Sequence, residues 1–298
     1  MKQLTYREAS KILPKRKFDA HKGDCGKIVI IGGSRDMSGA VVLAARAAFR
    51  SGAGLVYVIC PDSISKIIHT LTIESIVKGV KTNQKFGTFK ENSLDSTYNL
   101  IKNSDVMLIG PGMGQNQSTK KLLLKLLKNN LVKKNKNIKV ILDADAICLI
   151  DKKYIKNQKL SKYPFILTPH AGEMARLLKT NTSNIKNNRI EIASKTSKEL
   201  NSIIILKGAN TVISNPKKEI YINTTGNSGM ATAGSGDVLS GILSGLLGQG
   251  LDCFNAAKLA VYIHGLAGDY SKKGKGTLGL IASDIVENIP KAILSLKR

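Results

Sequence analysis

Short runs of apolar, β-branched residues recur along the chain, and stretches with apolar residues at helical spacing lie between them. Six runs predict buried strands: Lys27–Ile31, Leu55–Ile59, Asp105–Ile109, Lys139–Leu142, Phe165–Leu167 and Ser202–Leu206. Helices are predicted over Gly39–Ser51, Ser118–Asn129, Gly172–Lys179 and Ile185–Leu200. Strands and helices in alternation predict right-handed crossovers and a mainly parallel sheet covered by helices on both faces, which is an α/β fold.

The last third of the chain has a different pattern. A hairpin is predicted from Thr211–Ile213 to Glu219–Ile222, and helices are predicted over Asp237–Leu247, Asn255–Tyr270 and Ile281–Leu296. The first residues, up to about 20, predict a helix and a loop. Because neither an internal repeat nor a Pro/Ser-rich linker interrupts the sequence, we expect a single domain over residues 1–298.

Composition narrows the class of protein. The chain has 298 residues, 42% of them hydrophobic, which is enough for a large core. Neither a signal-like N-terminus nor the roughly 18 unbroken apolar residues of a membrane span is present. The four cysteines, which form no C-x-x-C pair, predict a reducing compartment. We therefore expect a cytoplasmic protein with no membrane partner; the cysteines are Cys25, Cys60, Cys148 and Cys253.

The charge is strongly basic, with 46 Lys and Arg against 21 Asp and Glu, a net charge of +25. Such a balance attracts polyanions, so nucleic acid is one candidate partner. However, the lysines are scattered through polar, Asn-rich stretches, and 6 Phe, 8 Tyr and no Trp leave few rings for stacking on bases. We favour a solvated, lysine-biased surface without nucleic acid, whose field also attracts small phosphorylated ligands.

Two familiar nucleotide signatures are missing. The Walker sequence G-x-x-x-x-G-K-[ST] is absent, and the Rossmann pattern fails at Gly110–Gly114 because Gln115 and Gln117 occupy its third glycine position. Two interpretations of Gly110–Gly114 stay open: a backbone that a ligand approaches closely, or a turn that needs positive φ.

The segment before the helix at Asp237 carries the strongest local signal. Gly234, Ser235 and Gly236 precede an apolar helix, so the free N–H groups at its start predict an anion site. Asp237 has two interpretations. It can cap the helix, or it can act as a base beside bound phosphates. A simple cap does not require the Gly-Ser-Gly run, so we favour the base.

Two more segments look like ligand sites. Lys207–Thr211 combines a cation, a glycine and polar groups, which suits a nucleotide, although a hairpin turn with a solvated lysine explains it equally well. Thr168–Glu173 ends a strand and starts a helix, which places His170 and Glu173 at the carboxyl end of that strand, where open α/β sheets bind ligands. A lone histidine is, however, more often structural. His264 lies in the middle of a predicted helix, so we expect it to be packed.

Seven segments together resemble the ADP/ATP-dependent NAD(P)H-hydrate dehydratases in order and spacing. Seven motifs in order are far more specific than any one of them. They are Gly26–Ser34 with Ser38–Ala40, Gly110–Gly114, Asp143–Ala146, Thr168–Leu177, Lys207–Thr211, Gly226–Asp237 and Val261–Asp269.

The resemblance implies a ribokinase-like three-layer α/β sandwich that repairs the hydrated cofactors NADHX and NADPHX. ADP or ATP would phosphorylate the C6 hydroxyl, assisted by Mg²⁺, and phosphate would then be eliminated. Carried over to matching positions, Asp237 would be the base and would contact the hydrate, and Gly234, Ser235 and Gly236 would form the anion hole. The nucleotide would be held by Lys207, Gly208, Ala209, Asn210, Thr211 and Gly236. The hydrate would be held by Ala40, Gly112, Gly114 and His170.

Several alternatives stay open. A small-molecule kinase of the hydroxyethylthiazole or vitamin-precursor type would use the same Gly-Ser-Gly-Asp segment, and a nucleic-acid-binding module is a less favoured alternative. The resemblance also suggests a homotetramer. The epimerase domain that many family members carry is not expected, because about 20 residues precede the first motif and a domain needs 50 or more. The choice between ADP and ATP, and between NADHX and NADPHX, is open.

Overall fold

The computed structural model describes residues 1–128, 138–156 and 165–297, which form one large sheet and a small two-stranded sheet. The strands of the large sheet are β1 (Lys2–Gln3), β2 (Lys27–Ile31), β3 (Leu55–Pro61), β4 (Ile76–Val80), β7 (Val106–Ile109), β8 (Lys139–Leu142), β9 (Ile166–Leu167), β10 (Ile203–Leu206), β11 (Thr211–Ser214) and β12 (Ile220–Asn223). Their spatial order is β1-β12-β11-β10-β9-β8-β7-β2-β3-β4. Among the described strands of this large sheet, only β11 runs antiparallel to its neighbours. The small sheet pairs β5 (Thr82–Asn83) with β6 (Thr88–Phe89).

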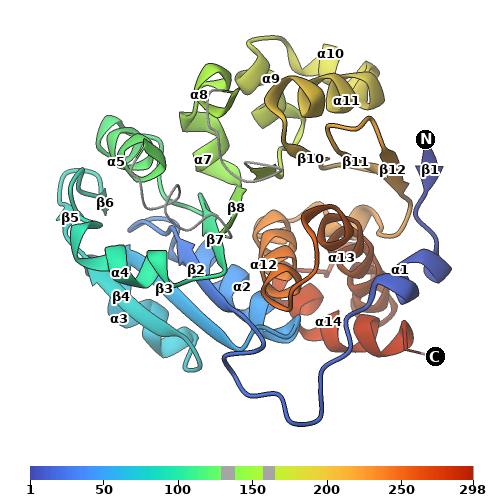
Figure 1. Ribbon diagram of the computed structural model, residues 1–298, viewed down its shortest axis with the longest axis horizontal. Coiled ribbons are helices and arrows are strands. Elements are labelled where there is room, and N and C mark those ends of the chain that lie inside the picture. Colours follow the sequence, from blue (N-terminus) through green and yellow to red (C-terminus); the bar gives the residue numbers. More distant parts are fainter. Residues whose placement is uncertain (129–137, 157–164, 298) are drawn as a thin grey trace.

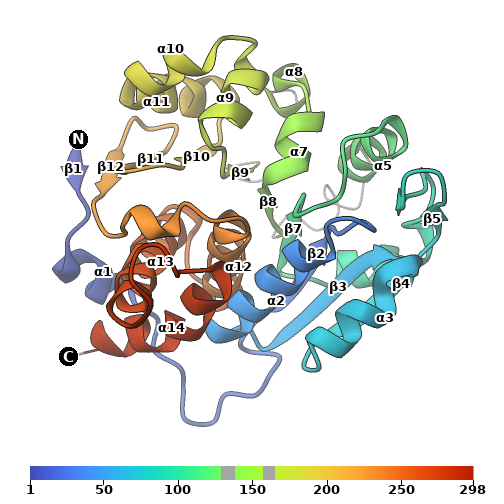
Figure 2. The same cartoon turned by 180° about the vertical axis from the view of Figure 1, so that it is seen from behind.

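Helices cover both faces of the large sheet, as Figures 1 and 2 show from opposite sides. One face carries α1 (Tyr6–Ile12), α2 (Ser38–Arg50), α3 (Asp62–Leu71), α12 (Ser235–Gly248), α13 (Cys253–Lys275) and α14 (Ala282–Ser295). The other carries α4 (Tyr98–Lys102), α5 (Gln117–Lys128), α7 (Ala144–Leu149), α8 (Lys152–Lys156), α9 (Ala171–Leu178), α10 (Thr182–Asn187) and α11 (Arg189–Leu200). Two 3₁₀ helices, η1 (Asp95–Thr97) and η2 (Ser228–Met230), complete the described elements.

The central strands bury both faces. In β2, Ile28 and Ile30 belong to the core under α2 and α12, whereas Val29 and Ile31 belong to the core under α5 and α9. Because side chains alternate along a strand, a strand between two helical layers needs apolar residues at every position. This burial explains the continuous apolar runs in the sequence and confirms the three-layer α/β sandwich.

Most sequence-based elements are confirmed, within a few residues at their ends. The single helix predicted over Ile185–Leu200 is wrong: α10 ends before Asn188, whose φ of −122° and ψ of 33° interrupt the helix, and α11 starts afresh. The edge strand β4 and helix α3 were not predicted, and β4 is mostly exposed, so it lacks the apolar run of a central strand. Asn129, the last residue of a predicted helix, lies outside the described residues.

Two further features of the described residues concern membrane spans and thiol groups. None of the helices in the described ranges is both long enough and apolar enough to cross a bilayer. All four cysteines have free thiols, and burial raises the pKa of the Cys60 thiol to about 12, so this thiol is unreactive at neutral pH.

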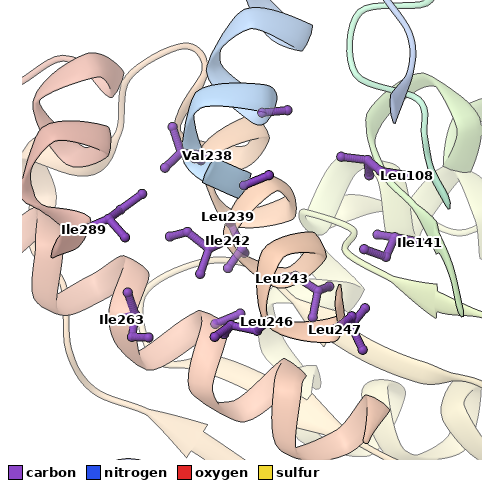
Figure 3. Close-up of a cluster of buried hydrophobic side chains, with 14 of the residues drawn as sticks. Leu108, Ile141, Val238, Leu239, Ile242, Leu243, Leu246, Leu247, Ile263 and Ile289 are labelled. Atoms are coloured by element: carbon purple, nitrogen blue, oxygen red, sulfur yellow. The ribbon is translucent and has the colours of Figure 1, made fainter. Parts of the chain in front are cut away.

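Helix α12 runs through the middle of one helical layer and is apolar on most sides. Figure 3 shows its Val238, Leu239, Ile242, Leu243, Leu246 and Leu247 packed among Leu108 and Ile141 from the sheet, Ile263 from α13 and Ile289 from α14. A Cβ on Gly241 would lie 2.3 Å from the Ala44 carbonyl oxygen, so α2 can approach only a glycine here. This close packing fixes the start of α12 relative to the sheet.

Candidate active site

Four parallel strands end at the same edge of the sheet, and the loops that follow them bring the candidate residues together. Strands β7, β8, β9 and β10 are consecutive neighbours, so their carboxyl ends lie side by side. They are followed by Gly110–Gly114, Asp143–Asp145, Thr168–His170 and Lys207–Asn210. Open α/β sheets bind ligands at this edge.

Lys207 is the centre of a buried ionic cluster. Its Nζ lies 3.0 Å from Asp143 Oδ1 and 3.6 Å from Glu173 Oε2. Thr168 Oγ1 donates to the same Asp143 oxygen at 2.6 Å. Burial tends to lower the pKa of Lys207, but the carboxylates of Asp143 and Glu173 outweigh it and raise that pKa above its usual value. The lysine is therefore a fixed positive charge.

Asp237 lies close to this cluster, at the start of α12. A Cβ on Gly236 would lie 3.1 Å from Lys207 Nζ, which joins the helix start to the lysine. Burial, together with the negative charge of Asp143, raises the pKa of Asp237 to about 8, although Lys207 acts in the opposite direction. Asp237 is therefore largely protonated at pH 7 in the free protein.

The start of α12 has no side-chain cap. Gly234 is the N-cap residue, with a φ of +87°, and no side chain accepts a hydrogen bond from the first turn. The N–H group of Val238 donates to the Gly234 carbonyl, whereas those of Gly236 and Asp237 have no acceptor among the described residues. The carboxylate of Asp237 does not act as the cap in this structure. Free N–H groups at the positive end of a helix dipole form an anion site.

Ser235 makes a contact that the sequence did not reveal. Its Oγ lies 3.2 Å from Nε2 of His264, which projects from α13. Burial lowers the pKa of His264 to about 4, so the imidazole is neutral at pH 7. The expectation that His264 is packed is correct, and the packing orients a residue of the predicted anion hole.

The Gly110–Gly114 loop is shaped by the segment after β8. A Cβ on Gly110, whose φ is +127°, would lie 1.8 Å from the Asp143 carbonyl oxygen, so only glycine fits. Ala144 has a φ of +46°, which turns the chain sharply between Asp143 and Asp145. Asp145 Oδ2 then accepts from the Gly114 N–H at 2.8 Å. The interpretation as a turn is confirmed, because Gly110, Gly112 and Gly114 all have positive φ. The close approach of a ligand to this backbone stays a prediction.

Of the other predicted hydrate residues, Ala40 borders this loop and His170 lies at the start of α9. A Cβ on Gly112 would lie 3.0 Å from Cβ of Ala40 at the start of α2, so these two residues are neighbours. His170 is the N-cap of α9: its Nδ1 accepts from the N–H groups of Gly172 and Glu173. Its Nε2 lies 3.4 Å from Glu173 Oε1, and more than half of the side chain is exposed to solvent, so it is accessible to a ligand.

The predicted nucleotide loop, Lys207–Thr211, is braced from within. Thr211 Oγ1 donates to the Gly208 carbonyl at 2.9 Å. The Lys207 N–H donates to the Pro169 carbonyl at 2.8 Å, which ties the loop to the segment that carries His170. The sequence-predicted site residues thus lie on adjoining loops and helix starts. Sequence analysis placed Glu173 at the ligand-binding edge, and the structure puts it beside Lys207. It gave no separate role to Asp143 or Asp145, although Asp143 directly follows a strand and Asp145 lies in the first turn of a helix.

The donor set of the cluster fits a magnesium ion. Asp143 Oδ2 is buried and has no hydrogen-bond partner, and Glu173 supplies a second carboxylate nearby. Among the described residues, no group of three or more His, Cys, Asp or Glu side chains could hold a metal ion. Mg²⁺ is commonly held by one or two carboxylates together with substrate phosphates and water. Asp143 and Glu173 are the residues that would hold it.

Comparison with known proteins relates this chain to one enzyme family. Residues 28–291 match the family model described as NAD(P)H-hydrate dehydratase. The chain is 39% identical over 287 residues to the bifunctional NAD(P)H-hydrate repair enzyme of Moorella thermoacetica, covering 96% of this chain and 52% of that protein. It is 36% identical to the ADP-dependent (S)-NAD(P)H-hydrate dehydratase of Neisseria meningitidis, covering 91% of this chain and 86% of that one. The chain spans about half the length of the bifunctional relative.

Solved structures of two related proteins have a similar fold. The ADP/ATP-dependent NAD(P)H-hydrate dehydratase from Bacillus subtilis, co-crystallised with ATP and Mg²⁺, superposes with a TM-score of 0.83 at 26% identity, covering 99% of this chain and 98% of that one. A ribokinase-like superfamily protein from Enterococcus faecalis gives 0.84 at 28% identity, covering 100% and 97%. The fold is ribokinase-like, and the chain belongs to the NAD(P)H-hydrate dehydratase family.

Proposed function

We propose that this protein dehydrates NADHX and NADPHX back to NADH and NADPH, using ADP or ATP as phosphoryl donor. The observation that carries the proposal is the position of Asp237, beside Lys207 and an uncapped helix start at the carboxyl edge of the sheet. A phosphoryl-transfer site needs fixed positive charge and free N–H groups around the phosphate, with a carboxylate that can accept a proton. Membership of the family supports the same activity.

The first step is phosphorylation of the hydroxyl on C6 of the damaged ring. The N–H groups of Gly236 and Asp237, with Ser235 beside them, bind the phosphoryl group that moves, and Lys207 adds its positive charge. Asp237 accepts the hydroxyl proton as the C6 oxygen attacks the terminal phosphorus of the nucleotide; the bond from that phosphorus to the bridging oxygen breaks, which releases AMP from ADP or ADP from ATP. Its carboxylate makes no hydrogen bond to the described residues, which leaves it available to the substrate. The protein's contribution is position and charge.

The second step is the loss of phosphate. The C6–O bond breaks, the ring nitrogen supplies the electron pair, and a proton leaves the neighbouring ring carbon. The result is the dihydronicotinamide of NADH or NADPH. Phosphate leaves far more easily than hydroxide, so the first step makes the second possible. Free N–H groups at the start of α12 stabilise the departing anion.

We propose that Asp143 and Glu173 hold Mg²⁺ at this site. When bound, the ion would offset negative charge on the phosphates. Asp143 keeps one oxygen on Lys207 and Thr168, so only its buried Oδ2 is left for a metal. This arrangement holds the carboxylate rigid whether or not a metal is present.

The deciding experiment is to incubate the protein with chemically prepared NADHX or NADPHX, Mg²⁺ and either ADP or ATP. Absorbance of the dihydronicotinamide should rise, and inorganic phosphate should appear in equal amount. A small-molecule kinase would instead leave a stable phosphoester and no such absorbance. If absorbance does not rise with either nucleotide, the proposal is wrong. The same comparison gives the preferred donor and the preferred hydrate.

Three further expectations are part of the proposal. Residues 1–298 act as one domain, the protein works in the cytoplasm without nucleic acid, and it assembles as a homotetramer. Light scattering after size-exclusion chromatography measures the mass against the 32.1 kDa of one chain. Filter binding at physiological salt measures nucleic-acid affinity, and tight, steeply salt-dependent binding would contradict the second expectation.

A further inference from the structure

Arg189, the first residue of α11, reaches the loop predicted to hold the nucleotide. Its Nη2 donates to the Leu206 carbonyl at 2.9 Å, and its Nη1 donates to the Ala209 carbonyl. The side chain is partly buried, and burial lowers the pKa of the guanidinium. Arg189 pairs with no carboxylate in the described parts of the chain, so its fork of donors serves the loop alone.

The guanidinium also limits the space around the loop. A Cβ on Gly208 would lie 3.1 Å from both terminal nitrogens of Arg189, so the loop backbone lies directly against the guanidinium. On the other side of the turn, Thr211 Oγ1 holds the Gly208 carbonyl. Side chains therefore fix two carbonyls of the Lys207–Thr211 loop and the carbonyl of Leu206 just before it, which limits rotation of these three peptide planes.

Fixing a carbonyl also fixes the N–H group of the same peptide. All described peptide bonds are trans, so the N–H of a peptide points opposite to its C=O. The Ala209 carbonyl points to Arg189 on α11, and hence the Asn210 N–H points away from α11, the helix on the opposite face of the sheet from α12. The N–H groups of Gly208, Ala209 and Asn210 have no acceptor among the described residues. They are available to a ligand.

We propose that Arg189 is a positioning residue for the nucleotide. Through the Ala209 carbonyl it keeps the free N–H group of Asn210 directed at an acceptor atom of a bound adenine nucleotide, and through the Leu206 carbonyl it holds the start of the loop in place. The inference rests on the proposed function, since it takes this loop as the nucleotide site. Lysine cannot replace arginine fully, because a single ammonium group lacks the planar fork that reaches two carbonyls at once.

The test compares Arg189→Gln and Arg189→Lys with the parent protein. Lys195→Gln is the matched control, because it removes one positive charge from an exposed position on the same helix. Isothermal titration with ADP and with ATP, without hydrate, gives the nucleotide Kd, and steady-state kinetics give separate KM values for nucleotide and hydrate. Arg189→Gln should weaken nucleotide binding about tenfold, which corresponds to about 1.4 kcal/mol.

The nucleotide Kd of Arg189→Lys should lie between those of the parent and Arg189→Gln. In Lys195→Gln the nucleotide Kd should stay within twofold of the parent. The hydrate KM should stay within twofold in every variant. A parent-like nucleotide Kd in Arg189→Gln would overturn the inference, and so would an equal rise in both KM values together with a lower Tm. If Arg189→Gln does not fold, Arg189→Lys decides by the same criteria.

The proposed function can fail separately. A parent protein that binds nucleotide but does not restore NADH or NADPH contradicts the proposed function only, and the Kd comparison still decides on Arg189. A parent protein that binds neither ADP nor ATP overturns both.

Discussion

The pKa of Asp237 makes a specific prediction for the pH dependence of turnover. A base must be ionised to accept the hydroxyl proton, and the pKa of Asp237 is raised to about 8 by burial and by Asp143. At pH 7, Asp237 is ionised in only about a tenth of the free enzyme molecules. This ionised fraction falls about tenfold for each pH unit below 7. We therefore expect the logarithm of kcat/KM to rise with a slope of about 1 per pH unit between pH 6 and pH 7.5. It should level off above about pH 8.

Replacing Asp237 by Asn removes the acceptor and keeps the shape. Turnover should fall by at least the ~10²-fold that general base catalysis typically contributes, and the slope with pH should disappear. The matched control is Asp252→Asn, because Asp252 is the N-cap of α13, accepting from the Phe254 N–H at 3.0 Å, and Asn caps about as well as Asp. The control should keep the parent's turnover and pH profile.

Stability should change with pH in a defined direction. The folded-state pKa of Asp237 lies above its ordinary value of 3.8, so the folded state holds this proton more tightly than the unfolded state. Protonation of Asp237 therefore adds to the free energy of unfolding. This contribution is fully present below about pH 4 and is lost as pH rises through about 8. Asn does not titrate, so the Tm of Asp237→Asn relative to the parent should increase between pH 5 and pH 8.

The assay follows NADHX-dependent absorbance from pH 5.5 to pH 9 with NADHX and nucleotide both well below their KM, so that the free enzyme is the reference state, beside thermal melts at each pH. An Asn variant that melts normally and still turns over NADHX within a few-fold of the parent would remove Asp237 from the mechanism. A parent kcat/KM that is flat between pH 6 and pH 8 would contradict the raised pKa as the controlling ionisation.

Three further predictions concern the loops around the cluster. Thr211→Val removes the hydroxyl that braces the Gly208 carbonyl and should weaken nucleotide binding by about 0.5–1.5 kcal/mol while hydrate binding is unchanged; equal losses in titrations with both ligands would indicate local unfolding instead. Gly110→Ala places a Cβ 1.8 Å from the Asp143 carbonyl oxygen at a φ of +127°, so urea unfolding should show a loss of about 2–4 kcal/mol; a parent-like midpoint would refute the tight approach. Lys207→Met leaves Asp143 and Glu173 without their cation and should cost up to about 3–5 kcal/mol of unfolding free energy, part of it recovered when Asp143→Asn is added; a double variant no more stable than Lys207→Met would show that the ion pair is not the cause.

The sequence alone determined the layers of the fold and the start of α12. Continuous apolar strands such as Lys27–Ile31 can be buried only between two layers, so the pattern required helices on both faces. Likewise, Gly234 and Gly236 before an apolar helix indicate a free helix start from local residues only. Elements that depend on weak local signals were missed: β4 is an exposed edge strand, and Asn188 breaks a helix whose apolar spacing continues across it.

The tertiary structure decided which of these local features meet. Asp143 and Lys207 are 64 positions apart and are joined only because β8, β9 and β10 lie side by side in the sheet. Ser235 and His264, 29 positions apart, meet because α13 packs against α12. Arg189 has no local signal at all, since its role comes from two carbonyls that another element presents to it. The raised pKa of Asp237 also comes from tertiary packing, because burial and a neighbouring carboxylate are properties of the packed site. Neither can be predicted from the periodicity of apolar residues along the chain.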